Sequence, residues 1–311
     1  MNAARLWDWV LLLICNLIWA TQFVMLKIVQ VQIGPVSATF FPMALATLFL
    51  LPVVWWQRRR SPNKSRIQRN DVWQFILIGV LGQVVAQLFV TWGVRYTLAS
   101  NAALIMLALP VLTAVMAYLF LGETMSALRW ASFALAIAGV LECSGIDWHA
   151  LNFTSRAYLL GNLFVLISVG GSAFYNVYSK KLLTRYTPLE VLLYSYYAVI
   201  VVLLPITLWL EPEGFRMLPH LTPAVWAGLA ALAILQYFAS MVIFLIVLSR
   251  LDATQASLSN YLIPFFGVVV AAIMLHEKLT LYMIFGGLLV LASTLLVTVY
   301  DEHRQRRLAG V

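Results

Sequence analysis

Charged residues are scarce in this sequence. Asp, Glu, Lys and Arg together make up 10% of the 311 residues, whereas apolar residues make up 63%. A soluble protein carries about a quarter charged residues, and no water-soluble fold could bury so much apolar surface. The composition therefore excludes a soluble protein and predicts an all-α membrane protein surrounded by a lipid bilayer.

Titratable side chains are also missing from the middle of the long apolar runs. The twelve acidic residues and four histidines lie near the ends of these runs or between them. Paired carboxylates, hydrolase triads, His-rich metal sites and buried proton relays would need such residues inside the membrane. We therefore expect neither an enzyme nor a metal or other cofactor. Coupling through span-end residues, exchange and facilitated transport all stay open.

Cysteines and phosphate-binding motifs are equally sparse. Cys15 and Cys143 both lie within apolar runs, so a disulfide framework is not expected. No Walker-type Gly-Lys loop is present, which argues against direct use of ATP. The net charge of +8 is concentrated in a few loops. It therefore indicates orientation in a membrane, and no nucleic-acid partner is expected.

The apolar runs themselves predict the membrane topology. A helix needs about 20 apolar residues to cross a bilayer, and the sequence contains ten such runs. Most connections between them are short, so neighbouring helices must be antiparallel. The predicted spans cover residues 7–29, 36–56, 73–94, 100–121, 128–146, 157–179, 188–210, 223–248, 253–275 and 280–300.

Landmarks repeat along the chain at a fixed interval. Pro110 and Pro264 are 154 residues apart, and so are Glu123 and Glu277. This interval predicts two similar five-span units. Because five is odd, the second unit enters the membrane in the opposite sense, as in the inverted repeats of many secondary transporters. The predicted units are residues 1–150 and 151–311.

Lys and Arg predict the orientation. With the N-terminus in the cytoplasm, fifteen of the twenty Lys and Arg residues fall on the cytoplasmic side and five on the other. Cytoplasmic loops of membrane proteins carry this excess. We expect a multi-pass protein of the inner (plasma) membrane with both termini in the cytoplasm.

These features together resemble the EamA family of the drug/metabolite transporter superfamily. The resemblance rests on five-plus-five spans, on the segment from Trp19 to Lys27, and on Leu-Gly-Glu and Leu-His-Glu ending at Glu123 and Glu277. In that family the first span of each half ends in a Lys. Lys27 and Lys180, which are 153 residues apart, match this pattern here. This sequence departs from the family's pattern in the sixth span, which lacks the Trp, and at His276, where the family usually has Gly. The resemblance implies export of metabolites by alternating access and names no substrate.

Neutral polar and aromatic side chains within the spans are the candidates for a substrate site. Trp19 is the one Trp far from both ends of its predicted span, where its N–H would need an acceptor in the protein or a wet cavity. Gln83 and Gln87 are four residues apart and share a helix face. Hydrogen bonding between helices is the competing explanation for each polar residue. The predicted cavity is lined by Trp19, Phe23, Gln83, Gln87, Asn101, Tyr175, Asn176, Tyr237 and Asn260.

The residues at span ends and the prolines have two interpretations each. Pro110 and Pro264 remove helix hydrogen bonds, so they are either packing kinks or functional hinges. Lys27 and Lys180 either extend to the interface or line the rim of the pathway. Glu123 and Glu277 are expected to cap turns or to pair with Arg129 and Lys278, with gating or coupling as the alternative.

Three functions compete at this stage. An exporter of small polar or amphipathic metabolites, amino-acid-like or drug-like, fits a neutral, aromatic-lined cavity. A nucleotide-sugar or phosphate-ester exchanger would need Lys or Arg in mid-span, and those residues lie at span ends. A non-transporting membrane scaffold would have no use for a polar midplane.

Overall fold

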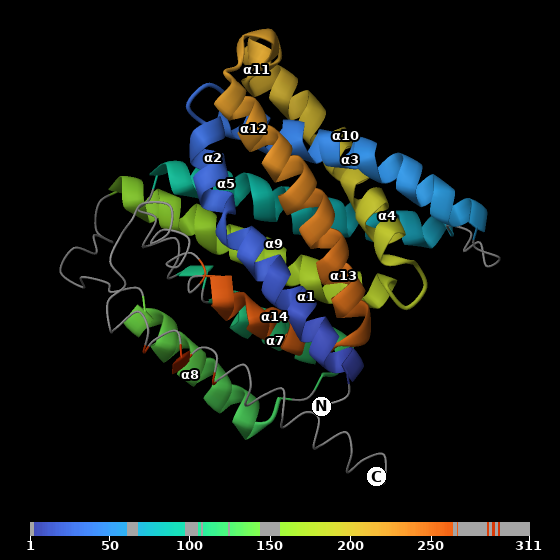
Figure 1. Ribbon diagram of the computed structural model, residues 1–311, viewed down its shortest axis with the longest axis vertical. Coiled ribbons are helices and arrows are strands. Elements are labelled where there is room, and N and C mark those ends of the chain that lie inside the picture. Colours follow the sequence, from blue (N-terminus) through green and yellow to red (C-terminus); the bar gives the residue numbers. More distant parts are fainter. Residues whose placement is uncertain are drawn as a thin grey trace.

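The computed structural model describes residues 3–60, 68–96, 105–106, 108–123, 125–143, 156–263, 266, 285, 288–289 and 292. Within these residues the chain is helical, with turns between the helices and no strand. Figure 1 shows the helices crossing one another as a bundle. The all-helical class predicted from composition is thus confirmed for the described part of the chain.

Long apolar helices correspond to most of the predicted spans. In the described residues, six helices are long and apolar enough to cross a membrane. A shorter apolar helix, α7 (Ala108–Leu121), lies in the predicted fourth span, and α8 (Ala127–Cys143) lies in the fifth. About half of the predicted ninth span and most of the tenth fall outside the described residues, so the count of ten stays a prediction. The six are Arg5–Leu26, Pro35–Arg60, Asp71–Tyr96, Leu159–Leu182, Pro188–Leu210 and Pro223–Arg250.

Several of these spans are built from more than one helical segment. The first consists of α1 (Ala3–Ala20) and α2 (Gln22–Val29), and the third of α4 (Arg69–Leu77), η1 (Ile78–Val84) and α5 (Val85–Tyr96). The eighth consists of α12 (Pro223–Ala231), η3 (Leu232–Ala239) and α13 (Ser240–Arg250). The remaining elements are α3 (Pro35–Arg60), α9 (Arg156–Leu182), α10 (Pro188–Leu210), α11 (Pro212–Met217), η2 (Leu218–His220), α14 (Ala253–Leu258) and η4 (Ser259–Tyr261).

Two of the interruptions are π-helical. Segments η1 and η3 widen the helix by one residue per turn, and they begin at Ile78 and Leu232, 154 residues apart. This is the interval that separates Pro110 from Pro264 in the sequence. A π-helical turn inside an α-helix is frequent at functional sites, and both segments supply side chains to the cavity described below.

The outward faces of the helices are apolar. Val201 is 72% exposed and Trp209 is 82% exposed, and both lie on α10. Exposed apolar surface on this scale marks an interaction site in a soluble protein. On a bundle of span-length helices it is the surface that contacts lipid.

Close helix packing joins the third span to the sixth, which run side by side in Figure 1 as α5 and α9. A Cβ on Gly171 would lie 2.8 Å from the backbone nitrogen of Ala86, and one on Gly93 would lie 2.6 Å from Val165 Cγ2. Ser168 also donates a hydrogen bond from Oγ to the Ala86 carbonyl oxygen, at 2.7 Å. Small residues let membrane helices approach in this way, so the two halves of the chain are in contact at this interface.

Ion pairs join the ends of helices through four acids, Asp8, Asp71, Glu190 and Asp252. Each of these acids pairs with a base from a distant part of the chain. The pairs are Asp8–Arg250 at 2.8 Å, Glu190–Arg58 at 2.8 Å, Asp71–Arg185 at 3.3 Å and Asp252–Arg129 at 3.2 Å.

A tyrosine adds to the Asp71 pair. Tyr186 donates its hydroxyl to Asp71 Oδ2 at 2.6 Å. Burial, together with the hydrogen bond and negative charge of Asp71, raises the pKa of Tyr186 to about 12. The hydroxyl therefore stays protonated at neutral pH and remains the donor in this bond.

Two glutamates cap helices of the opposite half. Glu123 accepts hydrogen bonds from the backbone N–H groups of Ala253 and Thr254, at 2.8 and 3.1 Å, where α14 begins. Glu211 accepts from the N–H groups of Val36 and Ser37, at 3.1 and 2.7 Å, where α3 begins. A carboxylate is favoured there because helix N-termini carry unpaired donors and partial positive charge. The capping role expected for Glu123 is confirmed.

Candidate substrate cavity

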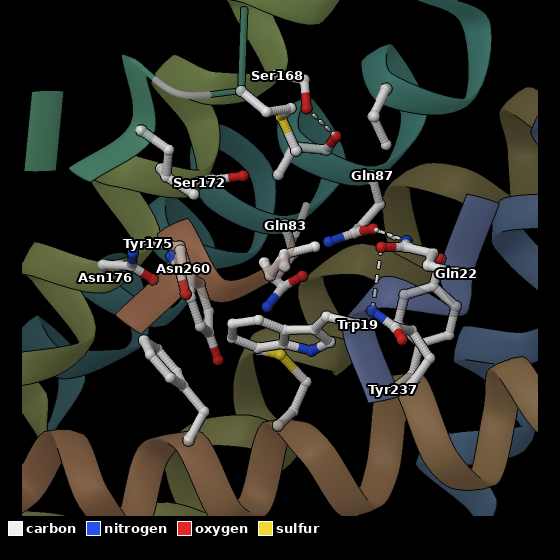
Figure 2. Close-up of a pocket in the computed structure, with 18 residues that line it drawn as sticks. Trp19, Gln22, Gln83, Gln87, Ser168, Ser172, Tyr175, Asn176, Tyr237 and Asn260 are labelled. Carbon is white, nitrogen blue, oxygen red and sulfur yellow. Dashed lines mark hydrogen bonds between the residues drawn. The ribbon is translucent and has the colours of Figure 1, made fainter. Parts of the chain in front are cut away.

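A cavity of about 100 Å³ lies among the helices, and Figure 2 shows its wall. This volume is several times what one buried water molecule needs, so the cavity can hold a small solute. It is lined by Trp19, Gln22, Gln83, Ala86, Gln87, Val90, Met106, Leu109, Ser168, Ser172, Tyr175, Asn176, Gln236, Tyr237, Met241, Phe244, Asn260 and Ile263.

Seven of the nine residues predicted for the site lie around this cavity: Trp19, Gln83, Gln87, Tyr175, Asn176, Tyr237 and Asn260. They come from the first, third, sixth, eighth and ninth predicted spans. The other two, Asn101 and the side chain of Phe23, lie outside the described residues. The structure thus brings the seven together, and their role in binding stays a prediction.

Gln22 lines the cavity but is not among the residues predicted from the sequence. It follows Trp19 by three positions, a spacing that places both on one side of a helix, and that spacing was available in the sequence. Gln236 was a second omission from the predicted site. Its side chain is buried at 6% exposure in η3, and only the three-dimensional contact with Gln22 shows what it does.

A chain of carboxamides runs along one wall of the cavity. Gln236 donates from Nε2 to Gln22 Oε1 at 3.0 Å, and Gln22 donates from Nε2 to Gln87 Oε1 at 3.1 Å. Tyr237 donates its hydroxyl to the same Gln87 oxygen at 3.5 Å. These bonds join the first, third and eighth spans and fix the three amides relative to one another (Figure 2).

Trp19 is held by a partner in the second half of the chain. Its indole Nε1 donates to Ser240 Oγ at 2.9 Å, and its ring lies 5.2 Å from the Phe244 ring, measured between centroids. The indole N–H thus finds the acceptor in the protein that its position requires. The half-buried Trp19 ring of α1 therefore forms part of the cavity wall.

The break between α1 and α2 falls two residues after Trp19. Thr21 donates from Oγ1 to the Ile18 carbonyl oxygen at 2.7 Å, and its backbone N–H bonds to the same carbonyl at 3.1 Å. These bonds tighten the turn and separate the two helical segments without a proline. Interrupted helices of this kind line substrate sites at the midplane of many transporters.

The cavity wall carries no formal charge. None of the eighteen described lining residues is Asp, Glu, Lys, Arg or His. The described residues also contain no group of three or more His, Cys, Asp or Glu side chains that could hold a metal ion. The wall can therefore offer hydrogen bonds, aromatic faces and apolar contacts to a solute.

Comparison with known proteins relates the chain to transporters. The model of the EamA-like transporter family matches residues 6–143 and again residues 159–299. The chain belongs to the EamA-like transporter family. The sequence resemblance noted above is thus confirmed, and the two matched ranges together cover most of the chain.

Two relatives of this EamA-like protein carry functional names. A probable terminal-alkyne amino-acid exporter of Streptantibioticus cattleyicolor is 31% identical over 243 residues, which cover 78% of each chain. An S-adenosylmethionine uptake transporter of Rickettsia felis is 23% identical over 288 residues, which cover 90% of this chain and 88% of the relative. A solved crystal structure superposes with a TM-score of 0.76 at 15% identity, covering 94% of this chain and 97% of the other. That structural match shows the fold.

The junction between α13 and α14 of the EamA-like protein is held by charged side chains. Lys180 donates from Nζ to the Leu248 carbonyl oxygen at 2.8 Å and to the Leu251 carbonyl oxygen at 2.5 Å. Together with the Glu123 cap and the Arg129–Asp252 pair, this places four charged side chains in or around a short connection. Lys180 therefore binds backbone carbonyls here, and a role at the pathway rim stays a prediction.

The predicted hinges are only partly described. Pro110 is buried in α7, next to Leu109, which lines the cavity. Pro264 lies outside the described residues. The hinge role of both prolines stays a prediction.

Proposed function

We propose that this chain is a secondary transporter that exports small polar or amphipathic metabolites by alternating access. The observation that carries the proposal is the uncharged cavity, which is lined by carboxamides and aromatic rings from both halves of the chain. Such a wall suits a solute that has polar groups together with an apolar part and carries little net charge.

An inverted repeat would support this mechanism, and it is part of the proposal. The interval of 154 residues between the π-helical segments and the two ranges that match the family model relate one half of the chain to the other. We propose ten spans in two inverted five-helix units, in the inner membrane with both termini in the cytoplasm. Rocking one unit against the other would then expose the cavity to each side in turn.

Amino-acid-like solutes are the class we favour. One relative is named an amino-acid exporter and another an uptake transporter for S-adenosylmethionine, which is itself derived from an amino acid. The two names point in opposite directions of transport, so export is part of the proposal and is tested separately from substrate class.

The competing functions are less well supported. A phosphate ester needs Lys or Arg at close range, and no lining residue in the described part of the chain is basic. A membrane scaffold has no need for a cavity with a polar wall. Neither alternative accounts for the amides that converge on this space.

An efflux assay tests the proposal. Purified protein is reconstituted into liposomes preloaded with a mixture of amino acids, nucleosides and sugar phosphates, and each solute is followed in the external buffer by mass spectrometry. We expect faster loss of one or more amino acids than from protein-free liposomes, and little effect on sugar phosphates. If no solute leaves faster than from protein-free liposomes, with or without imposed ion gradients, the proposed transport is wrong.

A further inference from the structure

The hydrogen bonds of Gln87 leave one side of its amide unused. Gln87 Oε1 accepts from Gln22 Nε2 at 3.1 Å and from the Tyr237 hydroxyl at 3.5 Å. These two donors orient the amide with its oxygen towards them. Figure 2 shows the nitrogen of Gln87 pointing away from Gln22, towards Gln83. The N–H2 group therefore has donor capacity that faces the cavity.

Acceptors without partners lie elsewhere in the same wall. In the described residues, four lining residues have a buried polar atom without a hydrogen-bond partner: Gln83 Oε1, Gln236 Oε1, Asn260 Oδ1 and the Tyr175 hydroxyl. The side chains of Gln83 and Asn260 are 2% and 7% exposed, and they come from η1 and η4. A buried carbonyl oxygen without a hydrogen-bond partner costs folding free energy. A ligand that brings N–H donors would remove this penalty once the amides turn towards it.

The charge of the cavity wall restricts which ligands can supply both the N–H donors and the acceptor oxygens. The wall offers a donor at Gln87, and the amides of Gln83 and Asn260 supply acceptors once they turn towards the ligand, but no lining side chain in the described part of the chain is charged. A ligand with net charge would be buried without a counter-charge, which is strongly unfavourable. A zwitterion carries its own counter-charge. Its ammonium group donates three hydrogen bonds, and its carboxylate accepts several.

We propose that Gln87, Gln83 and Asn260 form a subsite for the head group of an α-amino acid of zero net charge. The Gln87 amide donates to the carboxylate, and the carbonyl oxygens of Gln83 and Asn260 accept from the ammonium group. Rings of carbonyl oxygens replace the hydration of cations in ion channels in the same way. This assignment rests on the proposed function, because it concerns the substrate of that same cavity.

Four probes separate the two charges of such a head group. Norleucine carries both, norleucine methyl ester only the ammonium, N-acetylnorleucine only the carboxylate, and N-acetylnorleucine methyl ester neither. Binding to the full-length protein in nanodiscs is measured by calorimetry at pH 6, where the amino group is protonated. We expect norleucine to bind at least tenfold more tightly than any of the other three.

Substituting Gln87→Glu tests the donor. The carboxylate of that variant still offers an oxygen to Gln22 and Tyr237, and it replaces only the N–H2 group by a negatively charged oxygen. We expect the affinity for norleucine to fall at least tenfold and the preference to reverse in favour of the methyl ester. A variant that kept the wild-type affinity for norleucine would overturn the assignment.

Substituting Gln83→Met tests the acceptor. It removes the carbonyl oxygen at similar volume, so we expect an unchanged or raised Tm without ligand and an approximately tenfold loss of affinity for norleucine, as for a hydrogen bond to a charged group. Thr113→Val is the matched control. Thr113 is a buried residue of α7 whose hydroxyl also has no partner in the described residues, but it does not line the cavity. It should leave the affinity unchanged.

The outcomes separate this inference from the proposed function. If N-acetylnorleucine binds as tightly as norleucine, or if norleucine does not bind the wild-type protein, the subsite is wrong even when the efflux assay shows transport of other solutes. If the probes and variants behave as expected but no solute crosses the liposome membrane, the subsite stands and the proposed transport is wrong.

Discussion

Trp19 and Ser240 join the two halves of the protein at the cavity. The indole Nε1 donates to Ser240 Oγ at 2.9 Å, across 221 residues of sequence, and the Ser240 hydroxyl is in turn directed at the Gln236 carbonyl oxygen. The ring of Trp19 is thus fixed by the same span that supplies Gln236 and Tyr237. This link makes Trp19 the natural first site for mutation.

We predict that Trp19→Ala weakens norleucine binding at least tenfold, because the ring contributes a large apolar contact to the cavity wall. Trp19→Phe keeps a ring but loses the N–H, so it should bind more tightly than the alanine variant. It should lower the free energy of unfolding by about 1 kcal/mol, the contribution of one neutral hydrogen bond. Calorimetry and denaturation in nanodiscs measure both effects. Wild-type binding by folded Trp19→Ala would remove Trp19 from the site.

The Glu123 cap on α14 should contribute measurably to stability. Glu123→Ala leaves the N–H groups of Ala253 and Thr254 without their acceptor, and we expect a loss of about 1–3 kcal/mol in the free energy of unfolding. Glu213→Ala is the control, since Glu213 is an exposed acid and should change stability by less than about 0.5 kcal/mol. Equal melting temperatures for the two variants would contradict a stabilising role for the cap.

Two adjacent glycines of α9 should respond oppositely to alanine. A Cβ on Gly171 would lie 2.8 Å from Ala86 N, whereas a Cβ on Gly170 would have no neighbour within 4 Å. Gly171→Ala should therefore destabilise the protein by about 1–3 kcal/mol through overpacking of α5 against α9. Gly170→Ala should be neutral or stabilise the helix by up to about 1 kcal/mol. Thermal unfolding of the matched pair measures the difference, and similar shifts for both would contradict the close packing.

Cysteine labelling tests the predicted topology. Thr184 and Glu213 are both exposed and flank the span formed by α10. In a background lacking Cys15 and Cys143, we expect a membrane-impermeant maleimide to label Glu213→Cys in intact cells. Thr184→Cys should react only after permeabilisation, because its side of the membrane carries the excess of Lys and Arg. Labelling of both in intact cells would disprove the orientation.

Much of the site could be predicted because depth and helix face are readable from sequence. The length of an apolar run places Trp19 in mid-span, and a spacing of four places Gln83 and Gln87 on one face. The repeat interval then relates the spans of one half to those of the other. These local properties were enough to predict seven of the residues that line the cavity.

The remaining features depend on contacts between distant segments. The acceptor of Trp19 is 221 residues away, and the Glu211 carboxylate reaches the start of α3 from 175 residues away. No periodicity encodes such pairings. The π-helical segments η1 and η3 also escape sequence reasoning, since one extra residue per turn depends on how neighbouring helices pack. The role of Gln236 likewise comes from its contact with Gln22, whereas Gln22 itself could have been found from its spacing to Trp19.

Asn16 donates from Nδ2 to Ser259 Oγ at 2.9 Å, and the two residues are 243 positions apart in the chain. A ribosome releases the first span long before it makes the ninth. During that interval the indole N–H of Trp19 lacks its Ser240 acceptor, and the amide nitrogen of Asn16 bonds only to the Leu12 carbonyl oxygen of its own helix, which favours contact with the insertion machinery over contact with lipid. The order of synthesis thus makes the first span one of the last to reach its final packing, and a chain cut between its halves would leave that span incomplete.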